Sequence, residues 1–344
     1  MHDRNALFLN WLFSQLQTTT KLAILPDECD ITPLTGDAGF RRYFRVTLSN
    51  KNTYIGVDAP PKYSNNQAFV NLSSALEKTG VHVPKIFGFD EEQGFLLIED
   101  LGDVQFADVL NTETLMAKYQ LAIDELVKIN SIALSSWSPQ LPNYDDAFVL
   151  MELTIFKEWL LGEYLNIALT DEDESQLSQC FKQLVLNVAQ QPKVVMHRDY
   201  HSRNLMMAGD ELCVIDFQDA VAGALTYDIV SLLRDCYKRL PDDVIDQLFD
   251  YFIEQLSAKQ PLLANSVTRQ QWQVWFDLMG LQRHIKASGI FARLKLRDSK
   301  AGYIKDIPLT LTYIIDVAAK YDDLQWLSKF VERQVLPKVM EKLS

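Results

Sequence analysis

The sequence predicts an α+β protein in which a small, sheet-rich N-terminal part precedes a larger, mainly helical part. The chain has 344 residues, more than one hydrophobic core usually organises. Up to Gly102, short apolar runs end at clusters of turn-forming residues, as strands do. Beyond Gly102, apolar residues recur at helical spacing over long segments. We therefore expect two domains, residues 1–102 and residues 103–344, with a functional site in the cleft between them.

The first domain is expected to run strand, strand, helix, strand, strand. The segment "RRYFRVTL" alternates large apolar and polar residues, and "TYIGVDA" stops at two prolines. Apolar residues at helical spacing then precede Gly80, which ends the helix. The N-terminal "MHDRNALFLNWLFSQLQ" is typical of the start of an amphipathic helix and not of a secretory signal. The strands and the helix are expected, in chain order, at residues 41–48, 53–59, 65–79, 83–90 and 94–100.

The second domain is expected to be helical except around residues 194–216. There, two short apolar runs, "KVVMH" and "LCVIDF", are typical of strands. The helical segments are expected at residues 104–135, 144–168, 172–191, 243–258, 267–293 and 309–334.

Composition argues against several classes of partner. The formal net charge of −13 argues against nucleic-acid binding, which needs a basic surface to displace counterions. No uncharged apolar run approaches the roughly 18 residues of a membrane span. The four cysteines are scattered and form no CxxC pair, which is typical of free thiols in a reducing cytosol. We expect a cytoplasmic protein that binds neither nucleic acid nor membrane.

The segment "VVMHRDYHSRNLMM", residues 194–207, admits two interpretations. His197 and His201 are spaced i and i+4, as in a zinc-binding helix. A zinc peptidase helix also needs a glutamate after the first histidine as its general base, whereas Arg198 stands there. The pattern therefore favours the second interpretation, a catalytic loop for phosphoryl transfer.

For phosphoryl transfer, the protein must position the reacting groups, and a bound metal must neutralise the phosphate charge. A carboxylate must also lie near the attacking hydroxyl. Asp199 is the candidate carboxylate. Asn204 and Asp216 offer the hard oxygen ligands that Mg²⁺ prefers alongside phosphate oxygens and water. The sequence thus predicts an enzyme of phosphoryl transfer that uses Mg²⁺.

The chain resembles a known family at these motifs. "HRDYHSRNLM" with "VIDFQDAVAGALTYDIVSLLRD" is similar to the aminoglycoside phosphotransferase and choline kinase group, which has a protein-kinase-like fold. "GDAGFRRYFRV", "GFLLIEDLGD" and "DLMGLQRHIKASGIFARLKLRD" resemble the anomeric sugar kinases of bacterial cell-wall recycling, which phosphorylate N-acetylmuramate and N-acetylglucosamine at C1. The resemblance covers roughly residues 33–310. It implies a small-molecule kinase that uses ATP and Mg²⁺, with an antiparallel-sheet lobe that binds the nucleotide and a helical lobe that binds the sugar and carries out catalysis.

The resemblance also implies roles for individual residues of the loop. Asp199 becomes the catalytic base, and Asn204 and Asp216 become the metal ligands. His197 becomes a scaffold of the loop, and Asp228 ties the loop down through backbone hydrogen bonds. His201 either faces the substrate or makes a structural hydrogen bond, and Arg203 either neutralises phosphate or is solvated.

The nucleotide site departs from the kinase pattern. Gly36 and Gly39 form a turn whose amides are expected to cover the phosphates, and main-chain groups from Glu99 to Leu101 are expected to bind the adenine edge. The strand lysine that pairs with the α- and β-phosphates is missing, since Val57 and Asp58 stand at its place. Arg42, Arg45 or the metal alone is expected to replace it.

The acceptor is expected to meet a basic stretch near the C-terminus. This stretch is either a solvated helix face or a site for an anionic acceptor, such as the lactyl carboxylate of N-acetylmuramate. Arg283 and His284 are the candidate substrate-binding residues. The alternatives are a kinase of an aminoglycoside, an aminoalcohol or another small hydroxyl metabolite, and a non-catalytic pseudokinase.

Overall fold

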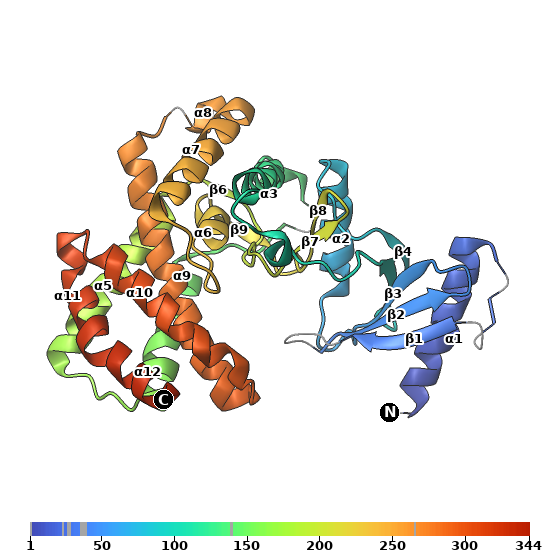
Figure 1. Cartoon of the computed structure of the whole chain (residues 1–344), viewed down its shortest axis with the longest axis horizontal. Helices are drawn as coiled ribbons and strands as arrows, with labels where there is room; N and C mark the ends of the chain where they lie inside the picture. The colour runs from blue at the N-terminus through green and yellow to red at the C-terminus, as the bar shows by residue number, and fades with distance from the viewer. Residues whose placement is uncertain (1, 23, 26–28, 35–39, 138–139, 265) are drawn as a thin grey trace. The chain divides into compact units, whose positions relative to one another are not determined.

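The computed structural model describes residues 2–22, 24–25, 29–34, 40–137, 140–264 and 266–344. The chain forms two compact units, one of residues 1–110 with 203–219 and the other of residues 111–202 with 220–344 (Figure 1). It passes from the second unit back into the first between Ser202 and Arg203, within the segment that the sequence singles out. The expected assignment of nucleotide binding and catalysis to separate domains stays a prediction.

The first unit is built on a five-stranded antiparallel sheet of order β1-β2-β3-β5-β4. Its strands are β1 Cys29–Leu34, β2 Arg42–Leu48, β3 Thr53–Asp58, β4 Ile86–Asp90 and β5 Phe95–Glu99. The unit also contains α1 His2–Thr20, α2 Asn66–Lys78, a 3₁₀ turn Phe106–Val109 and a hairpin of β7 Leu205–Ala208 with β8 Glu211–Val214.

Helix α1 covers one face of this sheet (Figure 1). Phe8, Leu12 and Leu16 recur at helical spacing and join a buried cluster with apolar residues of β2 and β5. The helix approaches the sheet closely at Gly56 on β3, where a Cβ atom would lie 3.0 Å from the Phe8 ring. A larger residue at this position would require the side chains of Phe8 and Leu12 to shift, so glycine lets the helix lie close to the sheet here.

The second unit is mainly helical. It contains one two-stranded ladder, β6 Lys193–Met196 with β9 Val221–Ala224. Its α-helices are α3 Leu115–Asn130, α4 Asp146–Ile155, α5 Asp171–Gln190, α6 Tyr227–Leu233, α7 Asp242–Lys259, α8 Pro261–Ala264, α9 Arg269–Asp298, α10 Ile307–Ala318, α11 Gln325–Phe330 and α12 Leu336–Leu343. Shorter elements are the 3₁₀ turns Leu134–Ser136, Ala301–Asp306 and Asp322–Leu324 and the π-helices Phe156–Tyr164 and Val331–Val335.

Helix α9 is the centre of the second unit. It is 30 residues long and contacts α4, α5, α6, α10 and the first π-helix. At Gly289 a Cβ atom would lie 2.6 Å from the backbone nitrogen of Phe156, so α9 meets the π-helix backbone directly. Because the middle of α9 is surrounded, polar side chains there, among them Gln282, Arg283 and Lys286, are buried inside the unit.

The predicted α+β class is confirmed, and the expected strand, strand, helix, strand, strand order matches β2, β3, α2, β4 and β5. Strand β1 was not predicted, because it is an edge strand with Pro33 and no clear alternation. The helix expected over 104–135 is shorter, as α3 with a preceding 3₁₀ turn, and the segment 309–334 is divided at Asp322–Leu324.

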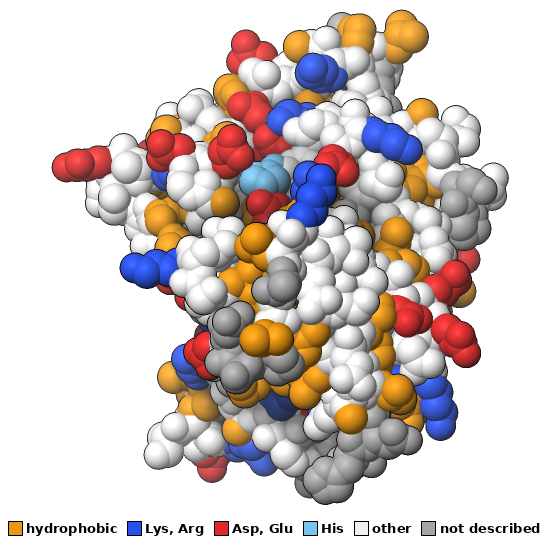
Figure 2. Space-filling model, turned by 90° about the vertical axis from the view of Figure 1, so that its right-hand side faces the viewer, with side chains coloured by type: hydrophobic (Ala, Val, Ile, Leu, Met, Phe, Trp, Pro, Cys, Tyr) orange, Lys and Arg blue, Asp and Glu red, His pale blue; other side chains and the backbone are white. Residues whose placement is uncertain are grey.

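Two surface properties bear on the predicted partners. In the part of the chain that the structure describes, no helix is both long and apolar enough to span a bilayer. Figure 2 shows one face of the molecule, where basic side chains lie scattered among acidic and hydrophobic ones and form no continuous stripe.

Candidate active site

The loop that contains Asp199 is fixed by a buried carboxylate in the second unit. Asp228, in the first turn of α6, accepts hydrogen bonds from the backbone N–H groups of His197 at 2.6 Å and Arg198 at 3.0 Å. Arg198 has a φ of 78°, a left-handed conformation that is unusual for a residue with a side chain. Because the loop is not helical, His197 and His201 do not lie on one helical face as a zinc helix requires.

A second buried carboxylate holds the far end of the same loop. The Asp235 carboxylate accepts hydrogen bonds from the hydroxyl of Ser202 at 2.5 Å and from its backbone N–H at 3.2 Å. Within the loop, Nδ1 of His197 accepts a hydrogen bond from the Asp199 N–H at 3.3 Å. The backbone on both sides of Asp199 is thus anchored to the unit's interior, which positions the carboxylate.

Asp199 is held in its ionised form by the electrostatic effect of its neighbours. Burial by itself would raise the pKa of this carboxyl group. Lys286, His201, His197 and Arg198 outweigh burial and leave the pKa below its ordinary value. Asp199 is therefore a carboxylate at neutral pH, able to accept a hydrogen bond and then a proton from a hydroxyl group.

Glu152 on α4 connects the loop to α9. Its Oε1 lies 3.1 Å from an Arg198 guanidinium nitrogen and 3.0 Å from Nζ of Lys286. Its Oε2 accepts hydrogen bonds from the Tyr144 hydroxyl at 2.6 Å and from Gln282 at 3.1 Å. Burial would raise the pKa of Glu152, but Lys286, Tyr144 and Arg198 hold it below its ordinary value. Glu152 thus fixes two of the cations that act on Asp199.

Arg283 is a buried cation of α9 in the same electrostatic environment. Its side chain is 8% exposed, and the guanidinium carbon lies 4.9 Å from the centroid of the Tyr227 ring. Burial would lower its pKa, but Tyr227, Cys236 and Asp199 raise it. Among the described residues, no carboxylate lies within ion-pairing distance of this guanidinium.

The two histidines proposed to meet the substrate differ in their surroundings. The His201 ring lies edge-on to Tyr237 at 5.7 Å between centroids, and its Nδ1 has no protein hydrogen-bond partner. His284 is completely buried, stacked on Tyr313 at 4.4 Å, and its Nε2 lies 2.9 Å from the Arg234 carbonyl oxygen. Burial, with the neighbouring Arg283, lowers the pKa of His284 to about 3. His284 is therefore neutral and packs the interior.

Asn204 and Asp216 lie together in the first unit. The Asn204 amide nitrogen is 3.3 Å from one Asp216 carboxylate oxygen, and the Gln218 amide donates to the other at 2.8 Å. Asp216 has a φ of 64°, and the next residue, Phe217, stacks on Phe69 of α2 at 4.9 Å. An amide and a carboxylate side by side are oxygen ligands of the kind that Mg²⁺ prefers, so these residues fit the predicted metal.

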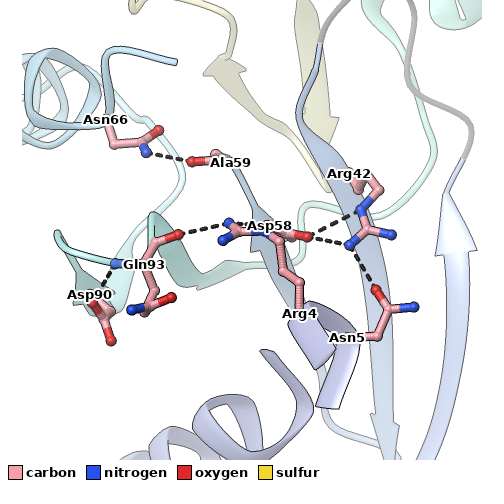
Figure 3. A network of polar contacts seen from close by, with 8 residues as sticks. All are labelled: Arg4, Asn5, Arg42, Asp58, Ala59, Asn66, Asp90 and Gln93. Atoms are coloured by element: carbon pink, nitrogen blue, oxygen red, sulfur yellow. Dashed lines mark hydrogen bonds and ion pairs between the residues drawn. The ribbon is translucent and has the colours of Figure 1, made fainter. Parts of the chain in front are cut away.

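Asp58 of β3 is completely buried and lies between two arginines (Figure 3). Arg4 of α1 donates to its Oδ1 at 2.6 Å and also to the Gln93 carbonyl oxygen at 2.7 Å. Arg42 of β2 donates to its Oδ2 and, at 2.8 Å, to the amide oxygen of Asn5. The acidic residue at the place of the kinase lysine thus ties α1 to the sheet.

The other residues expected at the nucleotide also have defined places. Arg45 pairs with Asp100 at 2.7 Å and with Asp103 at 2.8 Å. Glu99 ends β5, where its N–H donates to the Lys85 carbonyl, and Leu101 follows after one residue.

Arg203 is half-buried where the chain re-enters the first unit. Gly36 and Gly39 lie outside the described residues. The functional roles of all these residues stay predictions.

Sequence reasoning missed Glu152 and Asp235 and did not single out Lys286 from its basic neighbours. One signal was present: α9 contains "QRHIK", whose polar residues cannot all face solvent if the flanking "DLMGL" and "ASGIF" are buried. A helix that is apolar on most sides and still basic indicates buried, functional cations.

Comparisons with known proteins agree with this geometry. The model of the phosphotransferase enzyme family (APH) matches residues 30–262. The chain is 36% identical to an N-acetylmuramate/N-acetylglucosamine kinase of Pseudomonas putida, over 88% of this chain and 87% of that protein. It is 34% identical to the protein of the same name from Neisseria meningitidis, over 86% and 87% of the two chains.

Solved structures support the fold. An ADP-bound aminoglycoside phosphotransferase superposes with a TM-score of 0.55 at 17% identity, covering 86% of this chain and 95% of that one. This likeness confirms the protein-kinase-like fold that the sequence resemblance implies. Since the family model covers more than half of the sequence and the curated relatives match most of it, the chain belongs to the phosphotransferase enzyme family.

Proposed function

We propose that this protein transfers the γ-phosphoryl group of ATP to the anomeric hydroxyl of N-acetylmuramate and N-acetylglucosamine. The observation that carries the reaction type is the anchored, ionised Asp199 in a loop fixed at both ends by Asp228 and Asp235. The observation that carries the acceptor is the similarity, at about one third identity over most of the chain, to kinases named for these two sugars.

The residues of the second unit fit an acceptor that carries a carboxylate. N-acetylmuramate has a lactyl carboxylate, and a buried guanidinium without a protein carboxylate partner is suited to bind one bidentately. Arg283 is such a guanidinium in the part of the chain that the structure describes. Its charge interacts with that of Asp199, so an acceptor bound by Arg283 has its hydroxyl near the catalytic carboxylate.

In the proposed reaction, the acceptor oxygen attacks the γ-phosphorus and forms the new O–P bond. The bond from the γ-phosphorus to the bridging oxygen breaks, and that oxygen leaves on ADP. The acceptor proton passes to Asp199, whose carboxylate orients the hydroxyl beforehand. Lys286 and Arg198 keep Asp199 ionised until then.

Asn204 and Asp216 are the residues that would hold Mg²⁺. The metal, when bound, neutralises charge on the β- and γ-phosphates. Asp216 keeps its carboxylate in place through the left-handed backbone at this residue and the Gln218 hydrogen bond. We also propose that the protein works in the cytoplasm, in keeping with the scattered cysteines of the sequence, which form no CxxC pair.

The test measures two products at once. Purified protein with Mg·ATP is given N-acetylmuramate, N-acetylglucosamine, kanamycin, ethanolamine or choline, and ADP is measured. Phosphorylation at C1 removes the reducing end, so the reducing-sugar signal should fall by one equivalent for each ADP formed. Turnover with the sugars without loss of the reducing end would contradict the anomeric position. Turnover with another acceptor alone would contradict the substrate class.

The acceptor contact is tested by Arg283→Met, with Arg297→Met as the control. Arg297 is on the same helix but exposed and paired with Asp298. We expect Arg283→Met to raise KM for N-acetylmuramate by about 10- to 100-fold, the effect of losing a charged hydrogen bond. KM for N-acetylglucosamine, which has no carboxylate, should change much less, and Arg297→Met should change neither. An equal rise for both sugars would contradict the carboxylate contact.

A further inference from the structure

The missing strand lysine has a candidate replacement that the sequence did not suggest. In the β2–β3 ladder, Arg42 is opposite Asp58 and Tyr43 is opposite Val57. Successive side chains of a strand point to opposite faces, and Asp58 with Arg42 points to the face covered by α1. The other face at this position therefore carries Tyr43 and the apolar Val57.

Arg41 immediately precedes β2 and lies beside Tyr43. Burial raises the pKa of the Tyr43 hydroxyl, a hydrogen bond and charge from Arg41 lower it, and the charge of Asp216 raises it. The guanidinium carbon of Arg41 also lies 5.3 Å from the centroid of the Phe69 ring. Phe69 stacks on Phe217, the residue that follows Asp216. Arg41 is thus linked to the metal-ligand segment through both Tyr43 and Phe69.

The neighbouring arginines are already neutralised. Arg42 is paired with Asp58, and Arg45 is paired with Asp100 and Asp103. For Arg41, the described residues provide a phenol and an aromatic ring but no carboxylate within ion-pairing distance. Its side chain is half-buried. A cation fixed by uncharged groups keeps its full charge for an anionic ligand.

We infer that Arg41 binds the polyphosphate of the nucleotide and supplies there the positive charge that a strand lysine supplies in protein kinases. This inference rests on the proposed function in that the ligand is Mg·ATP. A guanidinium suits the task because its planar set of N–H donors can contact two phosphate oxygens at once. The stacked rings of Phe69 and Phe217 connect Arg41 to the segment that contains Asp216. The cation and the metal ligand therefore act on the same phosphates.

The experiment is a binding measurement by calorimetry without any sugar. The probes are Mg·ADP and adenosine, and the variants are Arg41→Met, Arg41→Lys and Tyr43→Phe. The control is Lys62→Met, which removes an exposed cation near another ring of the same unit, Tyr63. We expect Arg41→Met to weaken Mg·ADP binding by about 10- to 100-fold, as loss of a charged hydrogen bond does, and to leave adenosine unchanged.

The other variants sharpen the result. Arg41→Lys should recover most of the lost affinity because it retains the charge. Tyr43→Phe should cause a smaller loss for Mg·ADP, because Arg41 loses its hydrogen bond but not its charge, and Lys62→Met should have no effect. Unchanged Mg·ADP binding in Arg41→Met, or an equal loss for ADP and adenosine, would overturn the inference.

This design keeps the inference distinguishable from the proposed function. A wild-type protein that binds Mg·ADP but phosphorylates neither sugar refutes the acceptor and leaves the Arg41 comparison measurable. A wild-type protein that does not bind Mg·ADP refutes both. Thermal unfolding without ligand identifies a variant that has lost its fold, and in that case Tyr43→Phe decides the outcome.

Discussion

Each unit contains a buried carboxylate between two cations, and the two arrangements serve different ends. Asp58 is 0% exposed, while the side chains of Arg4 and Arg42 are 31% and 47% exposed. Glu152 is 3% exposed, and its partners Arg198 and Lys286 are 20% and 11% exposed. The first arrangement joins α1 to the sheet, and its cations reach water. The second keeps both cations at 20% exposure or less, and their charges act on Asp199.

The difference shows that ion-pair geometry alone does not identify a functional site. Both carboxylates make short, multiple contacts, and those of Asp58 join it to Arg4 of α1 and to Arg42 of β2. The cations of Glu152 act on a third group, Asp199, and lower its pKa. A buried pair is a functional candidate when its charge extends to a further titratable group.

The largest effect on turnover is expected from substituting Asp199, the carboxyl group whose pKa Lys286 and Arg198 lower. Asp199→Asn removes the proton acceptor and keeps the size of the side chain. We expect kcat to fall by about 10³-fold, within the usual range for loss of a general base. Mg·ADP affinity and the unfolding midpoint should change little. The measurement is steady-state kinetics beside calorimetry, and turnover within tenfold of wild type would mean that another group accepts the proton.

The next effect combines stability and rate. Glu152→Gln leaves Arg198 and Lys286 buried without their carboxylate, and breaking such a pair costs about 3–5 kcal/mol of unfolding free energy. Because both cations lose their carboxylate partner, kcat should also fall. We expect a fall of at least about tenfold, the factor that corresponds to one unit of pKa. Chemical denaturation and kinetics measure the two effects. A stability loss with unchanged kcat would show that Glu152 is architectural, like Asp58.

The matching substitution in the first unit, Asp58→Asn, should affect the unfolding free energy without affecting kcat. Asp58→Asn removes one charge, but Arg4 and Arg42 can turn to solvent, so we expect a smaller loss of about 1–3 kcal/mol. Turnover at saturating substrates should stay close to that of wild type, because the contacts of Asp58 lie where α1 joins the sheet. A drop in kcat as large as that of Glu152→Gln would remove the distinction between the two arrangements.

The sequence predicts the local parts of this site better than the distant ones. Asp199, Asn204 and Asp216 lie within one short segment whose spacing is set by the chemistry, so the pattern is visible along the chain. Glu152 meets Arg198 across 46 residues, and no local pattern encodes that contact. Fold class was also predictable, because strand alternation and helical spacing are local properties.

The residues proposed to bind the nucleotide show that sequence position alone does not identify which arginine is available to a ligand. The sequence places Arg41, Arg42 and Arg45 together before and within one strand. Which of them is neutralised depends on the face that each side chain takes and on the carboxylates brought there by β3 and the segment after β5. These partners are known only once the register of the sheet is known.

The smallest expected effect is a change in pH dependence, and it tests the second arrangement most directly. Asp199 must be ionised, so activity is lost as pH falls through its pKa. Burial raises that pKa, whereas Lys286, His201, His197 and Arg198 lower it, with Lys286 the largest of the four. Lys286→Met keeps the length of the side chain and removes its charge. The pKa of Asp199 should therefore rise, and the acidic limb of kcat/KM should move to higher pH.

Lys286→Arg, which retains the charge, is the matched control and should leave the limb close to that of wild type. Activity of Lys286→Met should recover as pH increases beyond the shifted limb, since Asp199 is ionised again there. A purely structural role for Lys286 predicts a different curve, lowered by one factor at every pH with its limb unmoved. The shape of the pH profile thus decides whether the buried pair of Glu152 and Lys286 holds helices together or sets the charge of Asp199.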